Sequence, residues 1–117
     1  MIRSYKDYIH DILSEIETIE IFNSSMDFES FKHDKKTVYA TIRSLEIIGE
    51  ASKMIPADLR LDYPDIPWVE IRNMRNKLTH EYFGVDIDTV WATIKNDLIE
   101  LKKVLKTILE DKRSLLT

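Results

Sequence analysis

The side chains best suited to chemistry lie within residues 68–86, a stretch that reads as one helix stopped by Gly84. Arg75, Asn76 and His80 lie close together on such a helix. Residues four positions apart are neighbours on one helix face, and a long arginine side chain reaches across from the adjacent row. The sequence therefore predicts that a cation, an amide and an imidazole converge on one spot.

This set of groups suits the cleavage of RNA. A neutral His80 imidazole can take the proton of a ribose 2′-hydroxyl near neutral pH, and the Arg75 guanidinium can hold the charge that develops on the phosphate. Such a reaction requires no metal ion and no cofactor. The spacing is weak evidence on its own, because an arginine followed five positions later by a histidine often occurs by chance. A solvated helix face is the plainer interpretation of the same residues.

Length and composition favour a single all-α domain over residues 1–117. The chain has 117 residues, 44% of them hydrophobic, with two glycines and three prolines, and its apolar residues recur at helical spacing. The absence of cysteine excludes disulfides and thiolate metal sites. We expect a cytoplasmic protein, because the N-terminus does not resemble a signal peptide and the apolar runs are short. The net charge of −4 means that any nucleic acid must bind a local basic patch.

Four principal helices are expected, the third being the stretch described above. The first covers about residues 2–22, where Tyr5, Ile9, Ile12, Ile16 and Ile19 form an apolar seam. The second runs from Asp34, its N-cap, to about Met54, and the last runs for about 24 residues after an N-cap at Asp86. Phe28 and Phe31 anchor a short turn between the first two. Residues 55–67 form a connection with one helical turn, and Pro67 suits the first position of the next helix.

A charged stripe lies on the outer side of the second helix. Arg43, Glu46, Glu50 and Lys53 recur at spacings of three and four. The simpler interpretation is an exposed ladder of ion pairs, each of which contributes little. In the other, part of the stripe faces the Arg75 and His80 cluster, and a carboxylate orients one of these side chains. Gly49 costs about 1 kcal/mol in mid-helix, so we expect another helix to approach closely there.

The same residues carry a family resemblance over nearly the whole chain. The sequence resembles the HepT-like family of the HEPN superfamily in four segments: Arg43 to Ala51 with the core Leu45-Glu46-Ile47-Ile48-Gly49-Glu50, Ile66-Pro67-Trp68, Met74-Arg75-Asn76-Lys77-Leu78-Thr79-His80-Glu81-Tyr82-Phe83-Gly84-Val85-Asp86, and Val90-Trp91 with Thr93-Ile94. This pattern is more specific than Arg75 and His80 alone.

The resemblance implies a HEPN-type bundle of four to five helices that forms a homodimer, with the two motifs in a shared cleft. It implies the toxin of a toxin–antitoxin pair, a metal-independent endoribonuclease. Arg75 and His80 would be catalytic, and Asn76 would support them. A minimal nucleotidyltransferase antitoxin would neutralise the toxin by attaching AMP to Tyr82. Helical spacing places Tyr82 on the apolar stripe instead, where it would be a core or interface residue.

An alternative from another functional class also fits the sequence. A non-catalytic HEPN-type dimer could bind a nucleotide or a partner protein, with Arg75 and His80 bonded inside the interface. The intact set of Arg, Asn, His and Tyr favours the ribonuclease. The acidic net charge favours the non-catalytic dimer.

Overall fold

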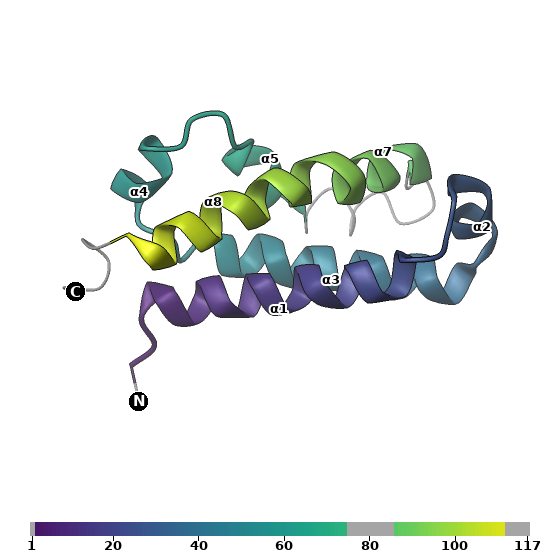
Figure 1. The fold of residues 1–117 in the computed structure, drawn as a ribbon, viewed down its shortest axis with the longest axis horizontal. Coiled ribbons are helices and arrows are strands. Elements are labelled where there is room, and N and C mark those ends of the chain that lie inside the picture. The colour runs from purple at the N-terminus through teal and green to yellow at the C-terminus, as the bar shows by residue number, and fades with distance from the viewer. Residues whose placement is uncertain (1, 75–85, 112–117) are drawn as a thin grey trace.

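The computed structural model describes residues 2–74 and 86–111, and every regular element within these ranges is a helix. The three long pieces are α1 (Tyr5–Asn23), α3 (Lys35–Ser52) and α8 (Leu98–Glu110), which lie along the long axis of the molecule (Figure 1). Because α1 runs against both α3 and α8, these helices pack as an antiparallel bundle. The all-α fold expected from the sequence is confirmed.

The first helix buries the seam that its spacing predicts. Ile9, Ile12, Ile16 and Ile19 are each at most 2% exposed, whereas Tyr5 is half-buried. The helix begins three residues later than expected, after Ser4, whose backbone N–H donates to the carboxylate of Asp7 at 2.9 Å. Such a bond satisfies one of the free N–H groups at a helix start.

The expected short turn is helix α2 (Phe28–His33), which lies at the far end of the bundle beside the start of α3 (Figure 1). Asp27 caps it by accepting a 2.8 Å hydrogen bond from the Ser30 backbone N–H. This bond holds the pKa of Asp27 below its usual value. Phe31 is fully buried and anchors the helix to the core, as expected.

Helix α3 confirms the predicted second helix. Its N-cap is Asp34, whose carboxylate accepts from the Thr37 backbone N–H at 3.1 Å. The helix ends at Ser52, two residues before the expected Met54. It packs on α1, α2 and α5, so α3 contacts elements that precede it and one that follows it in the sequence.

The connection after α3 contains the single helical turn expected there, α4 (Ala57–Leu61). Helix α5 (Trp68–Arg72) follows, with Pro67 at the N-cap position, one residue outside the helix. The prediction of one unbroken helix from Trp68 was wrong. Asn73 forms a turn with φ −88° and ψ 0°, and Met74 is helical again. Asparagine favours such a turn, because its short polar side chain competes for backbone hydrogen bonds.

The last predicted helix has the expected length but is interrupted. It consists of α7 (Ile87–Ala92), a wide π turn η2 (Thr93–Asp97) and α8. The Thr93 hydroxyl donates to the Thr89 carbonyl oxygen at 2.9 Å within this stretch. Val90 and Ile94, before and in the turn, and Leu98 just after it are all buried.

One continuous core joins these helices. Its members are the apolar side chains that face the bundle interior: Ile9, Ile12, Ile16, Ile19, Phe31, Val38, Leu45, Ile48, Ala51, Ile55, Ile66, Trp68, Ile71, Val90, Ile94, Leu98, Leu101, Leu105 and Ile108. In the part of the chain that the structure describes, no helix is long and apolar enough to span a membrane.

Candidate functional site

The predicted catalytic motif lies outside the described residues. Arg75, Asn76, His80 and Tyr82 all fall within 75–85. The structure does describe the elements on both sides of this segment, α5 before it and α7 after it, and the charged stripe of α3. These elements fix where the motif segment enters and leaves the bundle.

Helix α5 is anchored at its first residue. Trp68 is 7% exposed, and its indole N–H donates to the Tyr63 carbonyl oxygen at 3.0 Å. Ile71, one turn later, is 3% exposed. A buried aromatic ring with a satisfied N–H group holds a short helix far better than helix propensity alone. The chain therefore approaches the motif from a fixed position.

Gly49 of α3 marks the place where α5 ends. A Cβ atom added to Gly49 would lie 2.8 Å from the Ile71 carbonyl oxygen, 3.6 Å from the Arg72 carbonyl oxygen and 3.6 Å from the Met74 Cβ. The close approach of another helix expected at this glycine is confirmed. Met74, which directly precedes Arg75, therefore lies against the C-terminal turn of α3.

The charged stripe flanks this contact. Glu46 precedes Gly49 in α3 and Glu50 follows it. The two glutamates are four positions apart, so they share one face of the helix. The Arg43 guanidinium pairs with the Glu46 carboxylate at 3.3 Å, and the Lys53 ammonium pairs with Glu50 at 3.2 Å. The ladder of ion pairs proposed in the simpler interpretation is therefore present.

The two carboxylates of the stripe differ in exposure. The Glu46 side chain is 22% exposed, whereas that of Glu50 is 43% exposed. A carboxylate with restricted access to water acts more strongly on neighbouring charges than one in open solvent. Glu46 is therefore better placed than Glu50 to orient a cation or an imidazole.

The exit from the motif segment is held by an N-cap. Asp86 accepts from the Thr89 backbone N–H at 3.3 Å and from the Thr89 hydroxyl at 2.8 Å. The N-cap role predicted for Asp86 is confirmed. Met74, which packs against the core, and Asp86, which caps α7, are the described residues on either side of the motif segment.

A pair of carboxylates beside α5 could not be foreseen from the sequence. Burial, and then the negative charge of Glu70, raise the pKa of Asp97 above its usual value. Glu70 belongs to α5, and Asp97 ends the π turn. The two residues are far apart in the sequence, so only the packing of these elements brings their charges together.

The other two histidines lie on the surface. His10 is exposed on α1, and His33 is exposed at the end of α2. The His33 Nδ1 lies 2.9 Å from the Glu29 carbonyl oxygen.

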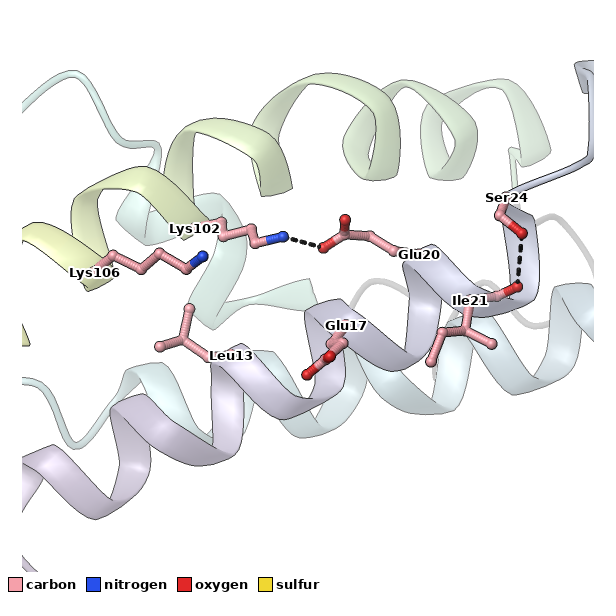
Figure 2. Close-up of a pocket in the computed structure, with 7 residues that line it drawn as sticks. All are labelled: Leu13, Glu17, Glu20, Ile21, Ser24, Lys102 and Lys106. Carbon is pink, nitrogen blue, oxygen red and sulfur yellow. Dashed lines mark hydrogen bonds and ion pairs between the residues drawn. The ribbon is translucent and has the colours of Figure 1, made fainter.

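An open groove of about 470 Å³ lies between α1 and α8 (Figure 2). Its lining consists of Leu13, Glu17, Glu20, Ile21, Ser24, Lys102 and Lys106. The Lys102 ammonium and the Glu20 carboxylate form an ion pair across it at 2.8 Å. No candidate from the sequence lines this groove, so it is separate from the predicted site.

Comparison with models of known protein families identifies the family of this chain. The sequence model of the family described as Ribonuclease HepT-like matches residues 12–108, which include the whole motif segment. The chain belongs to the Ribonuclease HepT-like family. The family resemblance inferred from the sequence motifs is thereby confirmed.

HepT-like relatives are similar over nearly their full length. The "Probable ribonuclease HepT" of Thermococcus cleftensis is 55% identical over 102 residues, which cover 87% of this chain and 93% of the relative. The "Putative RNase MJ0125" of Methanocaldococcus jannaschii is 49% identical over 109 residues, which cover 93% of this chain and 94% of the relative. No solved structure matches the chain.

Proposed function

We propose that this HepT-like protein is a metal-independent endoribonuclease and acts as the toxin of a toxin–antitoxin pair. Three observations support the proposal: the family match, the names of the relatives and the Arg75 to His80 motif inside the matched region. The observation that carries it structurally is the contact at Gly49, which places Met74, the residue before Arg75, against the part of α3 that contains Glu46 and Glu50.

The proposed reaction is attack by the ribose 2′-hydroxyl on the adjacent phosphorus. The neutral His80 imidazole removes the 2′-hydroxyl proton as the new O–P bond forms. The bond to the 5′-oxygen breaks, and this leaving oxygen takes up a proton. The Arg75 guanidinium binds two phosphate oxygens and stabilises their increased negative charge in the transition state. The products are a 2′,3′-cyclic phosphate and a free 5′-hydroxyl.

Residues of the charged stripe would position the catalytic groups. In this proposal Glu46 accepts a hydrogen bond from Arg75 or His80, and Glu50 lies on the other side of the entry point. Asn76 adds a polar contact to substrate or to His80. Arg43 keeps Glu46 in place through the ion pair at 3.3 Å. These are positioning roles, since the residues act through Arg75 and His80.

A homodimer would complete the site. In the proposed assembly the two motifs share one cleft, as the family resemblance implies, and the RNA lies between them. Val69, a large apolar side chain that is 56% exposed on α5, marks the surface that would form the interface. A twofold dimer would bury the same patch on both copies.

Control would come from a minimal nucleotidyltransferase antitoxin. Transfer of AMP from ATP to the Tyr82 hydroxyl releases pyrophosphate and leaves a phosphodiester on the tyrosine. The added phosphate would occupy Arg75, and the nucleoside would fill the cleft. RNA would then be excluded by charge and by volume.

A second function is favoured by the charge of the chain. With a net charge of −4, the protein has little overall attraction for RNA. A non-catalytic dimer that binds a nucleotide or a partner protein would agree with this charge. Such a protein would not cleave RNA under any condition.

A cleavage assay separates the two functions. Purified protein is incubated with a labelled RNA in EDTA, and the ends of the products are identified by mass spectrometry. We expect cleavage that leaves a 2′,3′-cyclic phosphate or its hydrolysis product. Arg75→Ala and His80→Ala should each abolish cleavage, whereas the surface controls Arg3→Ala and His33→Ala should retain it. Loss of cleavage on chelation, or normal cleavage by both motif variants, would contradict the mechanism.

A further inference from the structure

An aromatic cluster joins α2 to α7 at one end of the bundle. The Trp91 ring centroid lies 5.1 Å from that of Phe31 and 6.0 Å from that of Phe28, with an edge-to-face angle of 63° to Phe28. Phe31 is fully buried, whereas Phe28 and Trp91 are half-buried. The cluster therefore anchors α2 through Phe31 and presents part of two rings to solvent.

Two lysines lie over these half-buried rings. The Lys95 ammonium is 4.5 Å from the centroid of Trp91, and the Lys32 ammonium is 6.0 Å from that of Phe28. Both lysines are exposed. The four residues thus follow the order cation, ring, ring, cation, with Lys32 and Phe28 on α2, Trp91 on α7 and Lys95 in η2. We call these four residues the α2–α7 surface.

The lysines of this surface differ from several on α3 and α8. Lys53, Lys102 and Lys103 pair with carboxylates at 2.8–3.5 Å. Among the described residues, neither Lys32 nor Lys95 has a carboxylate partner. Two ammonium groups are therefore available to an external anion.

The acidic residues near α2 are already engaged. Asp27 and Asp34 cap α2 and α3 by accepting backbone N–H groups, and Glu29 lies 3.9 Å from His33. Two further exposed lysines, Lys35 and Lys36, begin α3 directly after α2. Residues 27–36 therefore carry three lysines and three carboxylates and are neutral overall, whereas the whole chain has a net charge of −4.

Cations beside half-exposed rings match the chemistry of single-stranded RNA. Such strands bind proteins by stacking bases on aromatic rings while lysines or arginines contact the phosphates. Paired bases in a duplex cannot stack on these rings. A base that stacks on Trp91 would displace the Lys95 ammonium from the ring, and that ammonium could then contact the next phosphate.

We propose that the α2–α7 surface binds single-stranded RNA beside the cleavage site. The proposal rests on the proposed ribonuclease function, because α7 begins directly after the motif segment and shares its attachment at Asp86. Lys32 and Lys95 contact phosphates, and Phe28 and Trp91 contact bases. RNA held there would extend from the nucleotides at the motif and raise the affinity for longer strands.

Binding can be measured without cleavage. The probe is a fluorescein-labelled 12-nucleotide oligouridine with 2′-O-methyl riboses, which lacks the attacking hydroxyl. Fluorescence anisotropy gives its Kd at several salt concentrations. Lys32→Gln/Lys95→Gln should weaken binding by about tenfold. Each lost phosphate contact removes about 0.7 from the slope of log Kd against log salt, so the slope should fall by about 1.4. The control Lys103→Gln/Lys106→Gln removes two exposed α8 charges and should change neither value.

Stacking is tested separately with Trp91→Phe. This variant keeps a ring against Phe31 but reduces the stacking area, so Kd should rise by about threefold with the salt slope unchanged. Circular dichroism and thermal melting check that each variant folds, and Phe28→Leu provides a second test of stacking if Trp91→Phe does not fold.

Three results would overturn this proposal: equal Kd values for wild type and the Lys32/Lys95 variant, equal loss in the control, or equally tight binding of a duplex of the same length. A surface that instead captures a protein partner would give the first of these. The outcome is independent of the nuclease assay. Absence of cleavage by the wild type refutes the proposed function, whereas the anisotropy measurements still decide whether this surface binds RNA.

Discussion

Gly49 and Ile71 are in backbone contact, and a Cβ atom on Gly49 would lie only 2.8 Å from the Ile71 carbonyl oxygen. Real Cβ atoms essentially never approach an oxygen so closely, so a larger residue must move α3 away from α5. The contact sets the position of Met74 and hence the point where the motif segment begins. The lack of a side chain at Gly49 therefore helps to set the position of the proposed catalytic motif.

The first prediction concerns this contact. Gly49→Ala should destabilise the protein by about 1–3 kcal/mol through overpacking, although alanine is normally the better helix former. Chemical denaturation measures the change. RNA cleavage should fall as well, because the motif shifts with α5.

The control is Ala40→Gly at a half-buried position of the same helix. It should cost about 1 kcal/mol from propensity alone and leave cleavage intact. A Gly49→Ala protein that is more stable than wild type would contradict the prediction, because it would show that α5 can move away from α3 at little cost.

The second prediction concerns Glu46. Glu46→Gln should lower kcat by about tenfold, equivalent to about 1.4 kcal/mol of transition-state stabilisation, because the carboxylate positions Arg75 or His80. Stability should change by no more than about 1 kcal/mol, as for other ion pairs at the surface.

A double-mutant cycle with Arg75→Lys tests the coupling. The two substitutions should be less than additive in kcat and additive in stability. Glu100→Gln removes the matched pair with Lys103 on α8, at 3.5 Å, and should leave kcat unchanged. Full additivity in kcat would show that Glu46 does not position Arg75 and only forms its ion pair with Arg43.

The third prediction concerns pH. Burial and the charge of Glu70 raise the pKa of Asp97 in the folded protein, so the folded state holds this proton more tightly than the unfolded chain does. The contribution of Asp97 to stability is therefore greatest at low pH and declines as pH rises from its ordinary value through the raised one.

Asp97→Asn should accordingly raise the melting temperature at neutral pH. The gain should disappear below about pH 4, near the ordinary aspartate value, where both proteins carry an uncharged side chain. Glu70→Gln should give a smaller gain in the same direction. Thermal melts between pH 3 and pH 8 provide the measurement, and a gain that does not depend on pH would contradict the assignment.

The fourth prediction concerns Tyr82. Incubation with ATP, Mg²⁺ and the cognate nucleotidyltransferase should add one or more units of about 329 Da, the mass of an adenylyl group. Peptide mass spectrometry should place them on Tyr82. Tyr82→Phe should remain an active ribonuclease and escape neutralisation. Modification of Tyr5, Tyr8, Tyr39 or Tyr63 instead would contradict the prediction.

The fifth prediction concerns assembly. Light scattering should give the mass of a homodimer at micromolar concentration. Val69 is 56% exposed on α5, so Val69→Glu should dissociate a dimer that brings the two motifs together. Ile21 is 69% exposed in the groove on α1, and Ile21→Glu should leave the dimer intact. A monomeric wild type would contradict the shared cleft.

Local signals in the sequence were sufficient for most of the helices. Asp34 and Asp86 act as N-caps because a short carboxylate reaches backbone N–H groups only three residues ahead. The apolar seam of α1 is likewise a property of spacing. Such features depend on neighbouring residues and can be read without knowing the rest of the fold. The motif positions were also found from the sequence, and residues 12–108 match the family that it suggested.

The break after Arg72 and the π turn were not foreseen, although each leaves a weak trace in the sequence. Asn73 disfavours a helix interior, and Val90, Ile94 and Leu98 are spaced by four twice. In a regular α-helix that spacing drifts by about 40° at each step. A wider turn keeps the three side chains on the buried face. Burial of these three side chains against other helices therefore favours the π turn over a regular α-helical turn.

The sequence by itself determined the N-caps at Asp34 and Asp86, which faces are apolar and which family the chain belongs to, and it supplied the residues proposed to cleave RNA. Only the tertiary structure decided that Gly49 meets the Ile71 carbonyl, that Asp97 feels the charge of Glu70 and that Trp91 joins α2 to α7 between two lysines. The physical reason is that hydrogen-bond caps and helical spacing act over a few residues, whereas these contacts join residues far apart in the chain and exist only once the core has packed.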